Sequence, residues 1–104
     1  MKDITQAIWY DEIKPNQKGV YLLVFHAVWC PPCRMFKESS EELANKDGIP
    51  VFRVDVDQNM KLSGEFGITN LPTWFIMKDG EVLQKMIGYK PYNELKQDVL
   101  KHIN

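Results

Sequence analysis

The longest apolar run of the chain spans residues 20–25, where six consecutive hydrophobic residues lack the alternation of a half-exposed strand. Such a run predicts a strand that is buried on both faces, which is typical of the centre of a parallel sheet. Two further strands are predicted over the β-branched run 50–56 and over residues 73–77. An Asp79-Gly80 turn joins the third strand to residues 82–87 and predicts an antiparallel hairpin.

Helical spacing fills the intervals between these strands. Shorter helices are predicted over residues 7–13, followed by a turn at 15–19, and over residues 59–66. A long amphipathic helix is predicted to begin directly after Cys30, which would cap it, and to end at Asp47-Gly48. Its inward face is marked by apolar or small side chains at helical spacing, namely Phe36, Ser40, Leu43 and Ala44.

A last helix is predicted to begin at Pro91, which is a favourable residue for a first helical turn. Its apolar face carries Tyr92, Leu95, Val99 and Ile103. Strands and helices thus alternate first, and a hairpin and a helix follow. This order predicts an α/β fold with a mixed sheet, helices on both of its faces, and one domain over residues 1–104.

The composition and charge of the chain limit the kinds of binding partner that can be expected. The chain is 44% hydrophobic and 26% charged, as is usual for soluble globular proteins. A formal net charge of −1 and the lack of a basic run argue against nucleic acid or an anionic membrane as a partner. The longest apolar run is far shorter than the ~18 residues that span a bilayer, and residues 1–6 do not resemble a signal peptide. We therefore expect a cytoplasmic protein.

The only two cysteines, Cys30 and Cys33, lie between the first predicted strand and the long helix, with Pro31 and Pro32 between them. Unpaired N–H groups and the positive dipole end at a helix start favour a thiolate. In a reducing compartment such a pair is redox-catalytic or metal-binding. A tetrahedral zinc site needs about four ligands, and His26 and His102 are not spaced to complete one. The redox interpretation is therefore favoured, without a metal.

The motifs and their order resemble the thioredoxin family over nearly the whole chain. The family's active-site motif matches Trp29-Cys30-Pro31-Pro32-Cys33, as a Cys-Pro-Pro-Cys variant. Four further segments match in order: the third strand and its exit at 54–59, the cis-proline loop at 66–73, the hairpin turn at 78–81, and the groove wall at Ile87-Gly88.

The resemblance implies a thioredoxin fold, with a central five-stranded mixed β-sheet flanked by four α-helices. It also implies a protein-disulfide reductase that exchanges a dithiol for a disulfide with protein substrates. Electrons would come from a thioredoxin reductase, with NADPH bound by the reductase and no cofactor bound by this chain. A monomer is expected.

The resemblance assigns roles at the site. Cys30 would be the nucleophile that forms a mixed disulfide, and Cys33 would resolve it. Pro72 would be cis and lie beside Cys30, so that Leu71 pairs with an extended substrate strand. An apolar surface around the cysteines would consist of Trp29, Leu71, Gly88 and Tyr89, although each of these also suits plain packing.

Within the motif, Pro31 stands where the family commonly has Gly. Pro31 and Pro32 both lack an N–H, so at least one donor toward the Cys30 sulfur is lost. Fewer donors would favour a more reducing protein, whereas a stiffer loop favours either redox form. The sequence therefore predicts that the redox potential of the cysteine pair is altered, but it does not predict the direction of the change.

Two departures from the family concern the surroundings of the cysteines. Val24 stands where the family commonly has a buried Asp that is thought to deprotonate the second cysteine, and Arg53, at the position of that Asp's Lys partner, is expected to be solvated. His26 replaces a Trp and should lie on the same side as Val24. We hypothesise that His26 bonds to Asp57 and confers a pH dependence near neutrality. The alternative is a histidine with a purely structural role.

Two other functions remain open from the sequence. One is a dedicated thioredoxin-like reductant for a specific partner, as in cytochrome c maturation. The other is a non-catalytic binding subunit with the same fold, which would keep its function without Cys30. Because both cysteines and the proline loop are intact, the sequence favours the general reductase.

Overall fold

A five-stranded mixed sheet forms the centre of the computed structural model, which describes residues 1–103. The strands lie in the order β1-β3-β2-β4-β5. β1 and β2 run parallel to β3, whereas β4 is antiparallel to β2 and to β5. Their bounds are Lys2–Asp3 for β1, Val20–His26 for β2, Val51–Asp55 for β3, Thr73–Lys78 for β4 and Glu81–Ile87 for β5.

The central strand is β2, as the unbroken apolar run predicts. Residues 21–26 of this strand are all buried. Leu23 lies between Phe52 of β3 and Phe75 of β4 in the sheet register. A strand that is paired on both edges and covered on both faces has no side facing water, so its sequence shows no alternation of polar residues.

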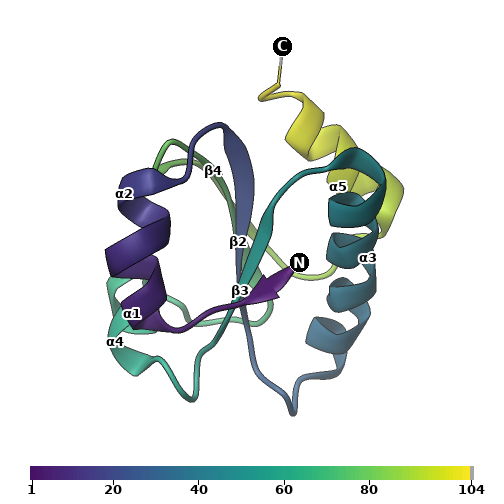
Figure 1. The fold of residues 1–104 in the computed structure, drawn as a ribbon. Coiled ribbons are helices and arrows are strands. Elements are labelled where there is room, and N and C mark those ends of the chain that lie inside the picture. The colour runs from purple at the N-terminus through teal and green to yellow at the C-terminus, as the bar shows by residue number, and fades with distance from the viewer. Residues whose placement is uncertain (104) are drawn as a thin grey trace.

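Two layers of helices cover the sheet (Figure 1). One layer holds the continuous helical segment of α1 (Gln6–Ile8), η1 (Trp9–Ile13) and α2 (Lys14–Asn16), together with α4 (Met60–Glu65). The other layer holds α3 (Pro31–Asp47) and α5 (Tyr92–Leu100). Counting the first segment once, residues 1–103 hold four helices, which confirms the predicted thioredoxin fold.

Each layer encloses its own hydrophobic core. Tyr21, Leu23 and Phe25 of β2 pack toward α1, η1 and α4, against Trp9 and Leu62. The next residues along β2 point to the opposite face and pack toward α3 and α5; their cluster includes Leu22, Val24, Phe36, Trp74 and Leu95. Each fully buried side chain of this size contributes about 1.5–3 kcal/mol of transfer free energy.

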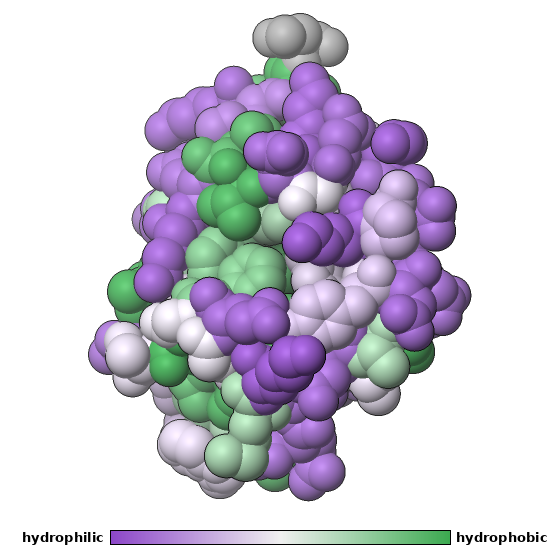
Figure 2. Space-filling model, turned by 90° about the vertical axis from the view of Figure 1, so that its left-hand side faces the viewer, coloured by the Kyte–Doolittle hydropathy of each residue, from purple (hydrophilic) through white to green (hydrophobic). Residues whose placement is uncertain are grey.

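The outer surfaces of the helices are polar. Seen from the side of α1 and α2, hydrophilic residues predominate and hydrophobic ones form scattered patches (Figure 2). This agrees with helices that turn one apolar stripe toward the sheet.

The structure differs from the sequence prediction at three places. Pro15 lies in helix α2 and not in a turn, because the flanking N–H groups of Lys14 and Gln17 still bond to the carbonyls of Trp9 and Ile13. Ile103 lies beyond α5, which ends at Leu100. β1 was not predicted from the pattern, since two residues carry no periodicity.

Gly80 offers a test of the contact between the β4–β5 turn and helix α2. It has φ +87°, and an added Cβ would lie 2.7 Å from the carbonyl oxygen of Lys14. Gly48, which ends α3 with φ +66°, has nothing within 4 Å of such a Cβ. We expect Gly48→Ala to cost about 1–2 kcal/mol of unfolding free energy and Gly80→Ala about 1–3 kcal/mol more because of the clash. Urea denaturation measures both, and equal losses would contradict the contact.

Candidate active site

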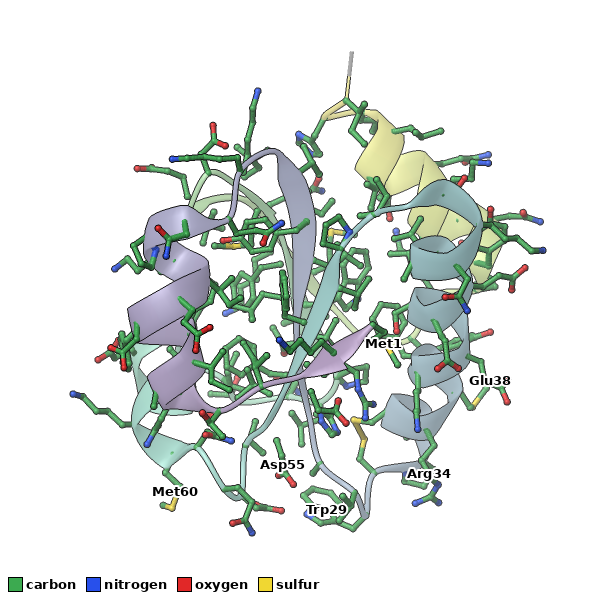
Figure 3. The ribbon with its side chains drawn as sticks, viewed as in Figure 1. Met1, Trp29, Arg34, Glu38, Asp55 and Met60 are labelled. Carbon is green, nitrogen blue, oxygen red and sulfur yellow. A yellow bond between two sulfur atoms is a disulfide. The ribbon has the colours of Figure 1, made fainter. Side chains whose placement is uncertain are left out.

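The two cysteines lie at the junction of β2 and α3, and the adjacent Trp29 is labelled at the lower end of the molecule in Figure 3. After β2 ends at His26, a short turn is closed by a bond from the Cys30 N–H to the Ala27 carbonyl, 3.3 Å long. Cys30 is the N-cap of α3, and its sulfur accepts a hydrogen bond from the Cys33 N–H at 3.3 Å. A helix start thus places one donor and the positive dipole end at the Cys30 sulfur.

Cys30 and Cys33 form a disulfide across the first turn of α3, with their Cα atoms 5.2 Å apart. Each cysteine is only 3% exposed. Together with Ala27 they form a small cluster, against which Val56 and Leu71 pack. The disulfide therefore packs against apolar side chains near the end of the central strand.

The loop that contains Leu71 and Pro72 contacts the same cysteine cluster. The Leu71–Pro72 peptide bond is cis, as the family resemblance implies. The Pro72 carbonyl accepts a bond from the Gly88 N–H at 2.8 Å, and the indole of Trp74 donates to the Gly88 carbonyl at 3.0 Å. The structure thus joins Pro72 to Gly88 and brings Leu71 against the cysteine cluster.

Exposed apolar side chains accompany the disulfide. Trp29 is 63% exposed and Val28 is 70% exposed, although they directly precede two buried cysteines. Tyr89, next to Gly88, is also exposed. Met60, at the start of α4, lies at the same end of the molecule as Trp29 (Figure 3). The sequence analysis did not single out Val28 and Met60, because only the fold shows that they stay uncovered.

The hypothesised bond between His26 and Asp57 is not present within residues 1–103. Instead, the indole Nε1 of Trp29 donates to Asp57 Oδ2 at 2.8 Å. The physical reason lies in the direction of each side chain. Asp57 lies in the exposed turn after β3, whereas His26 points from β2 into a cavity on the α3 side, the side of Val24 as expected.

This cavity has a volume of about 220 Å³ and reaches the second cysteine. Its lining consists of His26, Ala27, Val28, Cys33, Arg34, Lys37 and Arg53. Only 7% of His26 is exposed. Burial holds the pKa of His26 below its usual value of 6.5, and the cation of Arg53 adds to this effect.

Arg53 is not the solvated charge that the sequence suggested. It is only 8% exposed, and its Nε donates to Asp3 Oδ1 at 2.8 Å. The bond from Arg53 in turn lowers the pKa of the Asp3 carboxyl. The reason is the register of β1 and β3, which sets Asp3 directly beside Arg53.

Within residues 1–103, no group of three or more His, Cys, Asp or Glu side chains is arranged so that it could hold a metal ion. No helix of this part of the chain has the length and apolar character needed to cross a bilayer.

Comparison with known proteins agrees with this geometry. The family model described as Thioredoxin matches residues 1–101. The thioredoxin of Listeria monocytogenes is 38% identical over 105 residues, covering 99% of each chain. The thioredoxin of Bacillus subtilis is 39% identical over 90 residues, covering 85% of this chain and 86% of that protein.

Solved structures give the same result. The thioredoxin of Fasciola hepatica superposes with a TM-score of 0.86 at 29% identity, covering 98% of this chain and 99% of that one. A variant thioredoxin of Halobacterium salinarum gives a TM-score of 0.88 at 27% identity, with 98% and 89% covered. With its paired cysteines at the helix start, the chain belongs to the thioredoxin family and is a thiol–disulfide oxidoreductase that reduces disulfides of protein substrates.

Proposed function

We propose that the Cys-Pro-Pro-Cys motif is the active-site variant through which this chain works, with Cys30 as nucleophile and Cys33 as resolving residue. One observation carries the assignment: the Cys30 sulfur caps α3 and accepts the Cys33 N–H, so a thiolate there is stabilised. Cys33 lies one turn further in and at bonding distance, where it can attack Cys30.

The electrons balance in two steps. The Cys30 thiolate attacks one sulfur of a substrate disulfide, and the other substrate sulfur leaves as a thiolate. The Cys33 thiolate then attacks the Cys30 sulfur, so that the second substrate thiolate leaves and the Cys30–Cys33 disulfide forms. Two electrons pass to the substrate, and a reductant restores the dithiol.

In this proposal, the substrate segment would lie in a groove beside the disulfide. The residues lining this groove would be Trp29, Pro31, Pro32, Leu71, Pro72, Gly88 and Tyr89. Support comes from the exposed indole of Trp29, the contact of Leu71 with the cysteine cluster and the bond between Pro72 and Gly88. An extended substrate strand would pair with the backbone near Leu71.

The remaining parts of the assignment rest on the family. The chain would act as one domain over residues 1–104, as a monomer in the cytoplasm. It would bind no cofactor and take its electrons from a thioredoxin reductase that uses NADPH. The match of the family model over residues 1–101 supports this assignment.

Two polar residues would modulate the site. His26 would make the redox behaviour depend on pH, because it lines a cavity that reaches Cys33. Asp57 would act separately from His26, by orienting the Trp29 indole through the 2.8 Å bond.

Insulin reduction with dithiothreitol as donor tests the proposed roles. We expect Cys30→Ser to reduce turnover to the uncatalysed rate, since no nucleophile remains. Cys33→Ser should also lower turnover to the uncatalysed rate. When this variant is reduced, freed of dithiothreitol and mixed with insulin, it should hold one insulin chain on Cys30, which mass spectrometry detects. His102→Gln is the control and should keep full activity, because His102 lies beside Val20 at the start of β2, whereas the cysteines follow the end of that strand.

Other outcomes of this assay favour the other functions. A wild-type protein that is slow on insulin but forms the Cys30–Cys33 disulfide normally would indicate a dedicated partner. A cellular function that survives Cys30→Ser would indicate a binding subunit.

The neutral state of His26 leads to a prediction about stability. Because the folded-state pKa of His26 is lowered, the fold disfavours the charged ring. Its contribution to stability is therefore complete above the usual pKa of 6.5 and is lost as the pH falls below that value. We expect wild type to lose more unfolding free energy than His26→Gln between about pH 7.5 and pH 5.5. Urea denaturation at both pH values measures this, and parallel losses would refute it.

A further inference from the structure

The resolving step requires the Cys33 thiol to lose a proton in a poorly solvated place. Cys33 is 3% exposed, and it packs in the cluster of Ala27 and Cys30. Burial in apolar surroundings disfavours the thiolate. The hydrogen bond at the helix start goes to the Cys30 sulfur and does not help Cys33. A proton acceptor near Cys33 would therefore speed the step.

The carboxylates near the cysteine pair are engaged elsewhere. Asp3 accepts from Arg53, and Asp57 accepts from the Trp29 indole. Asp55 accepts from the Asp57 N–H at 2.9 Å. None of these three lines the cavity beside Cys33, and the strand position that faces this side, Val24, is apolar.

The cavity itself contains one group suited to accept a proton. Arg34, Lys37 and Arg53 are cations, and Ala27 and Val28 have no titratable group. The imidazole of His26 is the remaining side chain besides Cys33. Over residues 1–103 this ring makes no hydrogen bond, although the residue is more than nine-tenths buried. An unpartnered imidazole thus shares a cavity with the resolving thiol.

We propose that His26 accepts the proton of the Cys33 thiol, through water in the shared cavity, when Cys33 resolves the mixed disulfide. The volume of about 220 Å³ is enough for several water molecules, each of which takes about 30 Å³. This inference rests on the proposed role of Cys33. His26 would act at a distance, through water, and would deliver a proton taken up from solvent to Cys33 when the disulfide is reduced again.

The step balances in protons and bonds. The Cys33 S–H bond breaks and its proton passes to His26, which becomes an imidazolium. The Cys33 sulfur bonds to the Cys30 sulfur, and the bond from Cys30 to the substrate sulfur breaks. The substrate thiolate leaves and takes a proton from solvent, while the imidazolium loses its proton to solvent at the cavity mouth.

The charges around the ring suit a transient imidazolium. From β3, Arg53 opposes the charged ring and Asp55 favours it; from β1, Asp3 also favours it. From α3, Lys37 opposes it, and Arg34 lies at the same cavity. Burial and the two opposing cations keep the ring neutral and ready to accept, whereas the two carboxylates limit the cost of the charged state.

Stopped-flow reaction with the chromogenic disulfide dithiobis-nitrobenzoate separates the two steps. Reduced protein releases one nitrothiobenzoate as Cys30 attacks and a second as Cys33 resolves. We expect His26→Gln to keep the first phase and to slow the second about 10–100-fold near pH 7, as for loss of a general base. The gap should close at high pH, where hydroxide takes the proton. His102→Gln is the matched control and should keep both phases.

A second variant guards against a structural effect. His26→Ala enlarges the cavity, and added imidazole should restore its second phase in proportion to concentration, without changing the first phase. A His26→Gln protein with the wild-type second phase and pH profile would overturn the proposal. Equal slowing of both phases without rescue by imidazole would also overturn it, since His26 would then have only a structural role. A wild type that releases no second nitrothiobenzoate would instead refute the resolving role of Cys33.

Discussion

Burial of β2 on both faces is the constraint on which the rest of the structure depends. The strand has neighbours on both edges, and successive side chains enter two separate cores. Each core needs its own layer of helices, because an apolar sheet face left open to water loses its transfer free energy. A rigid strand between two cores is also a fixed support, and the cysteine pair follows directly after its end.

The site is assembled by strand direction. β2 and β4 are antiparallel, so the end of β2 and the start of β4 meet at one edge of the sheet. The cysteines follow β2 and the Leu71–Pro72 loop precedes β4, and they therefore lie together despite a separation of about forty residues along the chain. The bond from the Gly88 N–H to the Pro72 carbonyl extends the same edge to the end of β5.

The charges near Cys33 are arranged differently from what the family pattern suggests. With Val24 in the core, Arg53 finds its acid on β1, where the parallel register provides Asp3. The imidazole of His26 shares a cavity with the second cysteine and makes no hydrogen bond within residues 1–103. The side chain of Asp3 is 69% exposed, so its pair with Arg53 adds at most about 1 kcal/mol to stability. The two partners act in opposite directions on the pKa of His26, which Arg53 lowers and Asp3 raises.

The sequence by itself determined the local elements and the chemistry. An unbroken apolar run located β2, helical spacing located α3 and α5, and the Asp79-Gly80 turn located the hairpin. The spacing of Cys30 and Cys33 predicted the redox pair at a helix start. These features depend on neighbours along the chain, which a pattern reports directly. The tertiary structure alone decided which residues meet: Asp3 with Arg53, Trp29 with Asp57, and His26 with the cavity of Cys33. Those contacts depend on strand register and side-chain direction between distant segments, and no periodicity of the sequence encodes either.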